Sequence, residues 1–500
     1  MPAYMAYLSL IPFVLFCLLL IFHHRSSLLH VSFYTLLVTL FLVIFFWHTP
    51  TAVILQSSLK GFLVALDILF IIFGAILFLE ILKKAKIVGS LACHLENFSR
   101  DLRLQVILLA WFLENFLEGI AGFGTPSTVV APLLVALGIS PFSAVVIALL
   151  GNSTSVPFGA AGTPIRVGLA GLNLDLNTIA ITTAKINFIG LLVPVFMLLV
   201  LVSKQRHRQK LFFEGLPFAI WSGVAFVLPA YFISLFGYEF PSIIGSIIGL
   251  GLVLLTSRLG LFVPKNIFRL KIKKTTHLQP LTFFKTLAPY GLFVLLLIAG
   301  KFLFSKATFS LPFLNHSISL FNPGFVFIAT SFIVFPFLKI KSKPLKGLIK
   351  SSFIRTLEPF FVVAIMSIIV QLMNNSGDLS KNIISITKTI AGFLNTSFLP
   401  YFAPFIGAFG SFITGSATVS NLMFGSSLYS SGLLQHLSPQ NILSLALVGA
   451  GAGNMIALAD VLVAATVLGI SHSLRRILLA ILPYCLIYLI ITGVIGLIFL

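Results

Sequence analysis

The most constraining feature of the sequence is a pair of long apolar segments, within residues 111 to 166, that glycine, proline and small polar residues interrupt. The first interruption runs from Gly119 to Ser127 and the second from Gly151 to Pro157. In membrane hydrocarbon every backbone N–H and C=O group must be hydrogen-bonded internally, so unwound chain persists only where protein or a watery cavity covers it. Freed N–H groups attract anions and freed carbonyl groups hold cations. The interruptions therefore indicate a binding site at membrane depth.

Composition places these segments in a helical, polytopic membrane protein. Of 500 residues, 58% are hydrophobic and 9% are charged, against about 25% charged residues in a soluble domain. The net charge of +20 does not indicate nucleic-acid binding, because the basic residues gather between apolar segments, as they do in cytoplasmic loops. The first apolar segment is longer than a signal-peptide core and predicts an uncleaved span.

Motifs for metal, cofactor or enzyme chemistry are missing from the sequence. The three cysteines show no CxxC spacing, and the ten histidines form no HExxH motif. The AGFGTP glycines follow no βαβ pattern, and GNSTS is not a nucleophile elbow. We therefore expect no metal, no cofactor and no enzymatic activity. Because there is no nucleotide-binding motif either, uphill transport would depend on an ion gradient.

The order of the apolar segments predicts two halves of similar design, each with a hairpin followed by a broken helix. We predict an all-α polytopic membrane protein with inverted-topology repeats, two re-entrant hairpins and two broken transmembrane helices. The predicted parts are a first repeat at 1–210 (hairpin 104–138, broken helix 141–170), linking helices and a basic cytoplasmic loop at 211–285, and a second repeat at 286–500 (hairpin 400–434, broken helix 441–470).

Charge gives the expected orientation. If each hairpin enters and leaves on one side, the basic segments fall on one face, which the positive-inside rule places in the cytoplasm. Both termini then lie outside, the first hairpin opens to the cytoplasm and the second opens to the outer side. If two full spans replaced a hairpin, the chain after them would still emerge on the same side of the membrane. The charge distribution therefore does not decide between a hairpin and two spans. The short limbs and the Gly-, Ser- and Thr-rich middles favour hairpins.

Charged residues within apolar segments are functional candidates because each is costly there. Glu114 and Glu118 are four positions apart on one helical face, and two apposed carboxylates suit a proton carrier. The alternative is that one or both bond to a neighbouring backbone break or pair with Lys or Arg. Asp460 is either a second ion-coupling carboxylate or a helix N-cap. Arg166 either clamps a substrate carboxylate or extends to the interface. Structural ion pairs are the expected role of Asp67, Glu80 and Glu358.

Small polar and glycine residues at the interruptions are the remaining candidates for substrate binding. Hydroxyl groups in spans often only satisfy backbone groups, so the similar placement in two halves is the stronger signal. The candidates are Gly122, Gly124, Thr125, Ser127, Asn152, Ser153 and Thr154 in the first half, and Thr414, Gly415, Ser416, Thr418, Asn421 and Asn454 in the second.

Four segments of the chain resemble the L-lactate permease family. FLEGIAGFGTPSTVVAPLLVALGIS is similar to the family's EGAAGFGxPVA stretch, and ALLGNSTSVPFGAAGTPI resembles NTAPVAFGAxGIPI. PFIGAFGSFITGSATVSNLMFG resembles PFxGxxGxFxTGSDTSSNxLFG, and GNMIALADVLVAATVLG is similar to the region of GMISPQSIAIA. The positions that match are Glu118, Gly122, Gly124, Thr125, Pro126, Asn152, Thr414, Gly415, Ser416, Thr418 and Asn421.

The resemblance implies proton-coupled uptake of lactate or a related small carboxylate, such as glycolate, through a bacterial inner membrane. It also implies scaffold spans around paired re-entrant hairpins. The expected partners are the carboxylate, a proton or sodium as coupling ion, and the lipid bilayer, with no nucleic acid; a homodimer is one of the assemblies left open. A sodium-coupled or exchange-type transporter of organic anions is also compatible with the sequence. From a different class, a membrane enzyme or a passive channel is compatible with it as well.

Two positions depart from the family pattern. Ala417 stands where the family has an aspartate, and Arg166 stands where the family tends to be apolar. Loss of that aspartate would abolish proton coupling, change the coupling ion, or be offset by Asp460. Both departures make the site less acidic, which leaves the identity of the substrate open.

Overall fold

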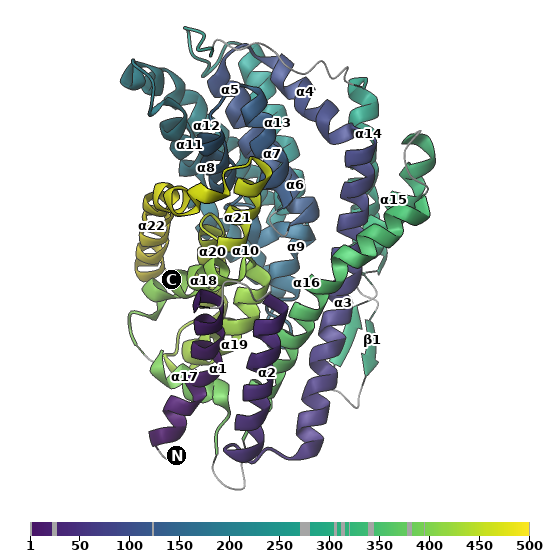
Figure 1. Ribbon diagram of the computed structural model, residues 1–500, viewed down its shortest axis with the longest axis vertical. Coiled ribbons are helices and arrows are strands. Elements are labelled where there is room, and N and C mark those ends of the chain that lie inside the picture. Colours follow the sequence, from purple (N-terminus) through teal and green to yellow (C-terminus); the bar gives the residue numbers. More distant parts are fainter. Residues whose placement is uncertain are drawn as a thin grey trace.

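The computed structural model describes residues 3–22, 28–122, 125–270, 281–304, 308–311, 316–319, 321–338, 345–377, 383–394 and 396–499. Most of them are helical, and the helices form one elongated bundle (Figure 1). The helices before the central basic loop are α1 (Ala3–Phe22), α2 (Leu28–Phe45), α3 (Thr51–Lys84), α4 (Ile87–Phe98), α5 (Leu102–Ile107), η1 (Leu108–Leu113), α6 (Glu114–Ala121), α7 (Thr125–Ala136), α8 (Pro141–Gly151), η2 (Val156–Phe158), α9 (Gly159–Arg166), α10 (Leu176–Ile186), η3 (Asn187–Leu192), α11 (Val193–Val202), α12 (Arg208–Ser234) and α13 (Pro241–Arg258).

The second part of the chain continues the same architecture. Its helices are α14 (Phe283–Phe304), α15 (Pro323–Val334), η5 (Phe335–Leu338), α16 (Leu345–Asn375), α17 (Ile386–Phe393), α18 (Leu399–Thr414), α19 (Ala417–Leu434), α20 (Pro439–Asn454), α21 (Leu458–Val467), η7 (Ser471–Ser473) and α22 (Leu474–Phe499). A short antiparallel pair of strands, β1 (Thr308–Leu311) and β2 (His316–Ser319), joins α14 to α15. This strand pair departs from the all-α fold that the sequence predicts.

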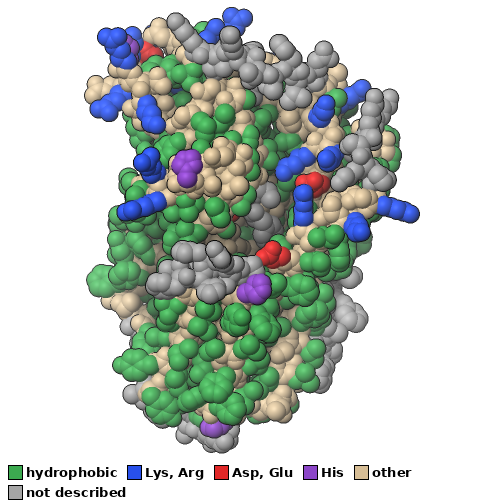
Figure 2. All heavy atoms as spheres, viewed as in Figure 1, with side chains coloured by type: hydrophobic (Ala, Val, Ile, Leu, Met, Phe, Trp, Pro, Cys, Tyr) green, Lys and Arg blue, Asp and Glu red, His purple; other side chains and the backbone are tan. Residues whose placement is uncertain are grey.

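The expected membrane character is confirmed. Ten helices in the described residues are long and apolar enough to cross a membrane, or eleven if the bent pair α8 and α9 forms one span. In the view of Figure 2, Lys and Arg side chains gather over the upper part of the molecule, whereas the lower part is largely hydrophobic.

Capping residues set several helix boundaries. Ser140 precedes Pro141, and its hydroxyl accepts a hydrogen bond from the Ser143 N–H at 3.3 Å, which starts α8. Ser416 starts α19 in the same way, by accepting from the Val419 N–H at 3.3 Å. Both helices therefore begin directly after a serine that caps them.

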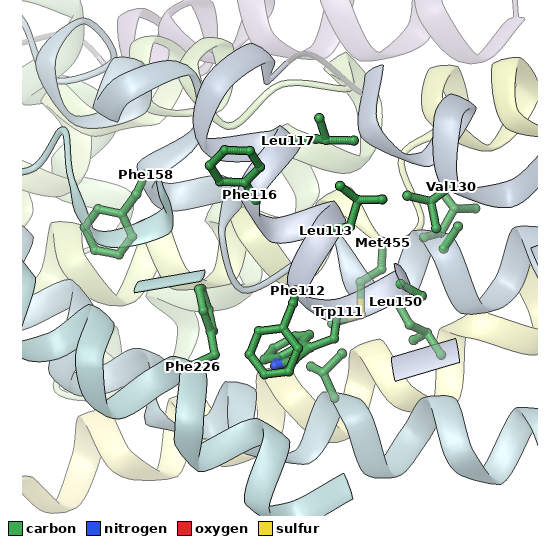
Figure 3. Packing of buried hydrophobic residues seen from close by; sticks show 14 of the residues in the cluster. Trp111, Phe112, Leu113, Phe116, Leu117, Val130, Leu150, Phe158, Phe226 and Met455 are labelled. Atoms are coloured by element: carbon green, nitrogen blue, oxygen red, sulfur yellow. The ribbon is translucent and has the colours of Figure 1, made fainter. Parts of the chain in front are cut away.

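The largest buried cluster surrounds the helix that runs from α5 through η1 into α6. Figure 3 shows Trp111, Phe112, Leu113, Phe116 and Leu117 pointing from this helix toward its neighbours, with Val130, Leu150 and Met455 close by. Trp111 donates to the Ser222 carbonyl at 3.1 Å, and its ring lies 5.2 Å from that of Phe226. Contacts with α7, α8, α12 and the second half therefore hold this helix in the interior.

The predicted interruptions are present as breaks between helices. The first hairpin candidate breaks after α6 at Gly122, and the second breaks between α18 and α19 at Gly415. Gly122 and Gly415 have positive φ angles of 60° and 69°, a conformation that favours glycine. The limb from Leu102 to Ala121 has 20 residues and is long enough to cross a membrane, so the expectation of short limbs is wrong for this limb.

Candidate functional site

Breaks from both halves of the chain meet around one small cavity. In the structure α9 contacts α19, η2 contacts α20, and α21 contacts both α7 and α8. The cavity has a volume of about 20 Å³, which holds about one water molecule. Its lining consists of Glu118, Gly122, Val156, Gly159, Ala160, Thr163, Pro164, Gly415, Ser416, Ala417, Thr418 and Asn454.

The helix that carries Glu118 contains a π-helical turn, η1, directly before α6. Insertions of this kind are frequent at functional sites because they change the direction of the following side chains. Glu118 is 4% exposed and points toward the break in the neighbouring broken helix. A Cβ atom added to Gly159 would lie 2.4 Å from the Glu118 Oε1 atom. Glycine at 159 therefore leaves room for this carboxylate.

The broken helix of the first half turns sharply beside Glu118. The axes of α8 and the segment after it differ by 59°. Within α9, Ala160, Ala161 and Gly162 have φ angles of 42°, 53° and 78°. A left-handed conformation costs about 1–2 kcal/mol for a residue with a side chain, so this turn is strained. Strain of this size persists only where the surrounding packing enforces it, as it does at many binding sites.

The second hairpin presents the N-terminus of α19 to the cavity. Thr414 ends α18, Gly415 reverses the chain and Ser416 caps α19. The N–H groups of Ala417 and Thr418, in the first turn, have no carbonyl partner within α19. Both residues line the cavity. Because free N–H groups and the helix dipole favour negative charge, this end of the cavity suits an anion.

The three predicted coupling acids are buried, and Glu118 lies close enough to interact with both of the others. The charges of Glu118 and Asp460 are near enough to interact. A Cβ atom added to Gly415 would lie 3.8 Å from the Asp460 Oδ1 atom, which places Asp460 beside the second hairpin turn. Glu114 is fully buried at the start of α6, four residues before Glu118, and accepts a hydrogen bond from the Ser127 hydroxyl at 2.7 Å. Glu114 is not part of the cavity lining.

Two asparagines accompany the acids. Asn152, at the end of α8, lies beside Glu118, but neither of its amide atoms has a hydrogen bond of standard geometry with any described group. Asn454, at the end of α20, interacts with Asp460 and accepts from the Ser411 hydroxyl at 3.3 Å. Each broken helix thus brings an amide to a carboxylate.

Several predicted residues bond to backbone instead of lining the cavity. Ser153 donates to the Leu150 carbonyl at 2.9 Å, and Thr414 donates to the Gly410 carbonyl at 2.8 Å. Asn421 donates to the Pro164 carbonyl at 3.0 Å and so joins α19 to α9. Gly124 and the side chain of Thr125 lie outside the described residues. Of the substrate-binding candidates, Gly122, Gly415, Ser416, Thr418 and Asn454 line the cavity.

Arg166 lies away from the cavity lining. Its guanidinium donates to the Phe321 carbonyl at 2.8 Å. Nearby, Lys301 forms two hydrogen bonds of 2.8 and 2.7 Å with the buried Glu239 and lies 5.8 Å from the Phe321 ring centroid. The structure therefore places Arg166 beside a cluster that contains the buried Glu239 and Phe321. Its predicted role as a carboxylate clamp stays a prediction.

The expectation of structural ion pairs has different outcomes at the three acids. Glu80 pairs with Arg355 at 2.8 Å, as expected. Glu358 forms no ion pair with any residue that the structure describes, so the expectation is wrong there. The side chain of Asp67 lies outside the described residues.

Sequence reasoning missed a buried network behind the first broken helix. The Tyr488 hydroxyl donates to the Asn187 amide oxygen at 2.7 Å, and the Asn187 amide donates to the Thr154 carbonyl at 2.6 Å. This network holds the unwound segment between α8 and η2 through the Thr154 carbonyl. A lone asparagine in the apolar segment of residues 178–202 was the available signal for Asn187, whereas Tyr488 is 301 positions away from it.

The fold and the site define a multi-pass membrane protein whose helices break around a small cavity that a buried carboxylate lines. The family model of L-lactate permease matches residues 5–317 and 300–500. A putative L-lactate permease of Haemophilus influenzae is 31% identical over 440 residues, covering 80% of this chain and 81% of the relative. L-lactate permeases of Streptococcus iniae and Escherichia coli are 27% and 24% identical, and each match covers at least 84% of this chain and 90% of the relative.

The chain belongs to the L-lactate permease family. This confirms the resemblance of its four interrupted segments, and it identifies a bacterial, multi-pass inner-membrane protein from a family of permeases.

Proposed function

We propose that this protein transports lactate, or a related small carboxylate, across the inner membrane together with a proton. The observation that supports this most is the cavity itself, which has Glu118 on one side and the N-terminus of α19 on the other. The helix end suits the carboxylate of the substrate, and the acid suits the proton. The names of the relatives support lactate as the first substrate to test.

Proton binding fits the surroundings of Glu118. A charged carboxylate in a low-dielectric interior is costly unless it is paired, and taking up a proton removes that cost. Glu118 has another acid, Asp460, nearby, and no described Lys or Arg forms an ion pair with it. Asp460 lies beside Gly415, two residues before Ala417, where the family pattern has an aspartate. We propose that it compensates for that missing acid.

In this proposal the two halves are inverted repeats, and the segments 104–138 and 400–434 are re-entrant hairpins. Support comes from the matching order of break and broken helix in each half, and from the contacts of α9 with α19 and of η2 with α20. A cavity that holds about one water molecule is too small for lactate. Substrate entry therefore requires one hairpin or one broken helix to move away from the cavity.

The test is uptake of labelled L-lactate into proteoliposomes containing the purified protein. We expect saturable accumulation when the lumen is alkaline, and no accumulation when a protonophore collapses the pH gradient. If accumulation follows an imposed sodium gradient, the coupling ion is sodium and not the proton. If the protein shows only counterflow, it is an exchanger. Flux without saturation or accumulation would indicate a channel and contradict the proposal. Parallel assays with glycolate, pyruvate and dicarboxylates would define the substrate range.

A further inference from the structure

We propose that a cationic cavity on the face that carries the basic loops binds the phosphate group of an anionic ligand. This cavity is separate from the central site and has a volume of about 490 Å³. It lies between the connection of α4 to α5 and the end of α13 with the loop that follows it. In Figure 1 these elements meet at the top of the molecule.

Two arginines from different segments line the cavity. Arg100 comes from the α4–α5 connection, and Arg258 is the last residue of α13. The Arg258 guanidinium lies 5.9 Å from the centre of the Phe98 ring, a cation–π contact that positions it. Among the side chains that the structure describes, no carboxylate forms an ion pair with Arg100 or Arg258. Their positive charges are therefore available to an anion.

Hydroxyl groups supply further donors. Ser99 and Ser257 also line the cavity. The Ser257 Oγ atom is buried and makes no hydrogen bond with any described group. A buried hydroxyl of this kind normally has a partner. An occupant that accepts hydrogen bonds would provide one.

The acidic group in the cavity wall is already neutralised. Asp101 accepts hydrogen bonds from the Arg103 guanidinium at 3.0 and 2.7 Å and from the Phe268 N–H at 3.0 Å. Arg103 is fully buried and also donates to the carbonyl groups of Leu211 and Asn266. This network fixes the two walls of the cavity relative to each other without opposing a bound anion.

Phosphate is the group that best matches these donors. Its several oxygen atoms accept hydrogen bonds from different directions at once, and Arg guanidinium groups match that geometry. Leu104, Val263, Pro264 and Ile267 form an apolar wall beside the arginines. The wall suits a ligand whose phosphate is attached to an apolar body, as in an anionic phospholipid, while a soluble phosphate ester would use the arginines alone.

Occupation of this cavity has a mechanical consequence. A phosphate between Arg100 and Arg258 would link the connection before α5 to α13. Because α5 continues through η1 into α6, the link lies at the start of the helix that carries Glu118. This inference goes beyond the transport function proposed above and does not depend on the substrate.

Binding can be measured on the purified full-length protein by native mass spectrometry and by thermal shift. The probes are short-chain phosphatidylglycerol, short-chain phosphatidylcholine as the zwitterionic control, and glycerol phosphate as the soluble ester. The test variant is Arg100→Gln/Arg258→Gln. The matched control is Arg475→Gln/Arg476→Gln, which removes the same charge from exposed positions outside this cavity. We expect the test variant to bind phosphatidylglycerol about 25-fold more weakly, about fivefold for each arginine, and the control to bind it normally.

The variant Arg100→Lys/Arg258→Lys guards against a folding artefact, because it keeps the charges and should bind with intermediate affinity. Binding of phosphatidylglycerol alone would identify a lipid headgroup as the source of the phosphate, and equal binding of glycerol phosphate would identify a soluble ester. Equal weakening in the test and control variants would overturn the proposal. So would a wild-type protein that binds neither phosphate probe more tightly than phosphatidylcholine.

Discussion

The two halves of the molecule bring their acids to the cavity on different elements. In the first half Glu118 is on α6, the limb before the hairpin turn, whereas the second hairpin has no acid in its turn and has Ala417 at the start of α19. The acid of the second half, Asp460, is on the broken helix instead. The order of the helices is therefore similar in the two halves, but the acidic residues are on different helices. In the function proposed above, Asp460 on the broken helix takes over the role of the acid that is missing at Ala417.

The breaks themselves also differ. The first broken helix bends by 59° and contains three consecutive left-handed residues, whereas α20 and α21 together still qualify as one 29-residue span. Thus the first half has the strained turn, the π-helical segment and two buried glutamates, and the second half has the helix N-terminus that faces the cavity. We infer that the first half mainly binds the proton and the second half mainly binds the substrate carboxylate.

The largest effect is expected from Glu118→Gln, which tests whether the first half binds the proton. If one proton accompanies each lactate, a gradient of about one pH unit sustains about tenfold accumulation. Glu118→Gln keeps the shape of the side chain but cannot carry a proton, so accumulation should fall to about the equilibrium value without coupling. The measurement is the ratio of internal to external lactate in proteoliposomes.

A matched control for Glu118→Gln is Glu80→Gln. Glu80 forms its ion pair with Arg355, whose side chain is 61% exposed, so this control removes a carboxylate far from the cavity and should keep full accumulation. If the Glu118→Gln variant still accumulates lactate fully, the proposal that the first half binds the proton is wrong.

The next effect tests whether Asp460 compensates for Ala417. Asp460→Asn should lower the rate of pH-driven uptake about fivefold, which corresponds to about 1 kcal/mol of coupling between neighbouring groups. Ala417→Asp added to Asp460→Asn should restore part of the rate, since both positions adjoin the second hairpin turn. Initial rates at several pH gradients measure this. A double variant no faster than Asp460→Asn would show that the two positions are not equivalent.

The sequence predicted the breaks well because their cause is local. Gly122 and Gly415 adopt left-handed conformations that glycine permits, and Ser416 caps the helix that follows. The rule that unwound chain must be covered at membrane depth then predicts that the breaks lie inside the protein. The residues that line the cavity were less predictable. Hydroxyl groups such as that of Thr414 bond to the preceding helical turn, and sequence alone does not show which of them do so.

Long-range contacts account for the remaining differences between the sequence-based predictions and the structure. The sequence gives no sign that Arg166 meets the Phe321 carbonyl, 155 positions away, or that Tyr488 supports Asn187. The left-handed turn at Ala160 and Ala161 was also unpredictable, because alanine rarely adopts it and only the surrounding packing enforces it. Gly159 could have been noticed as a glycine beside the break. Its function became visible only when the structure placed Glu118 against it.

A smaller effect should follow from crowding Glu118 without removing it. In Gly159→Ala the new Cβ would lie 2.4 Å from the Glu118 Oε1 atom, which is the end of a flexible side chain and can move. We expect a folded protein with severalfold slower uptake, measured together with the melting temperature. Gly251→Ala is the control, because no atom lies within 4 Å of its added Cβ, and alanine favours helices by about 1 kcal/mol relative to glycine. Unchanged uptake in Gly159→Ala would mean that the carboxylate position is not critical.

The smallest expected effect concerns Arg166, the only charged residue in the sequence of the first broken helix. It bonds to the Phe321 carbonyl and does not line the cavity, so Arg166→Gln should change the apparent Km for lactate by less than about twofold. Arg475→Gln, at an exposed position near the start of α22, controls for the loss of one positive charge. A severalfold rise in Km specific to Arg166→Gln would restore the carboxylate clamp that the sequence suggested. It would also move part of the substrate contact into the first half, against the division of roles inferred above.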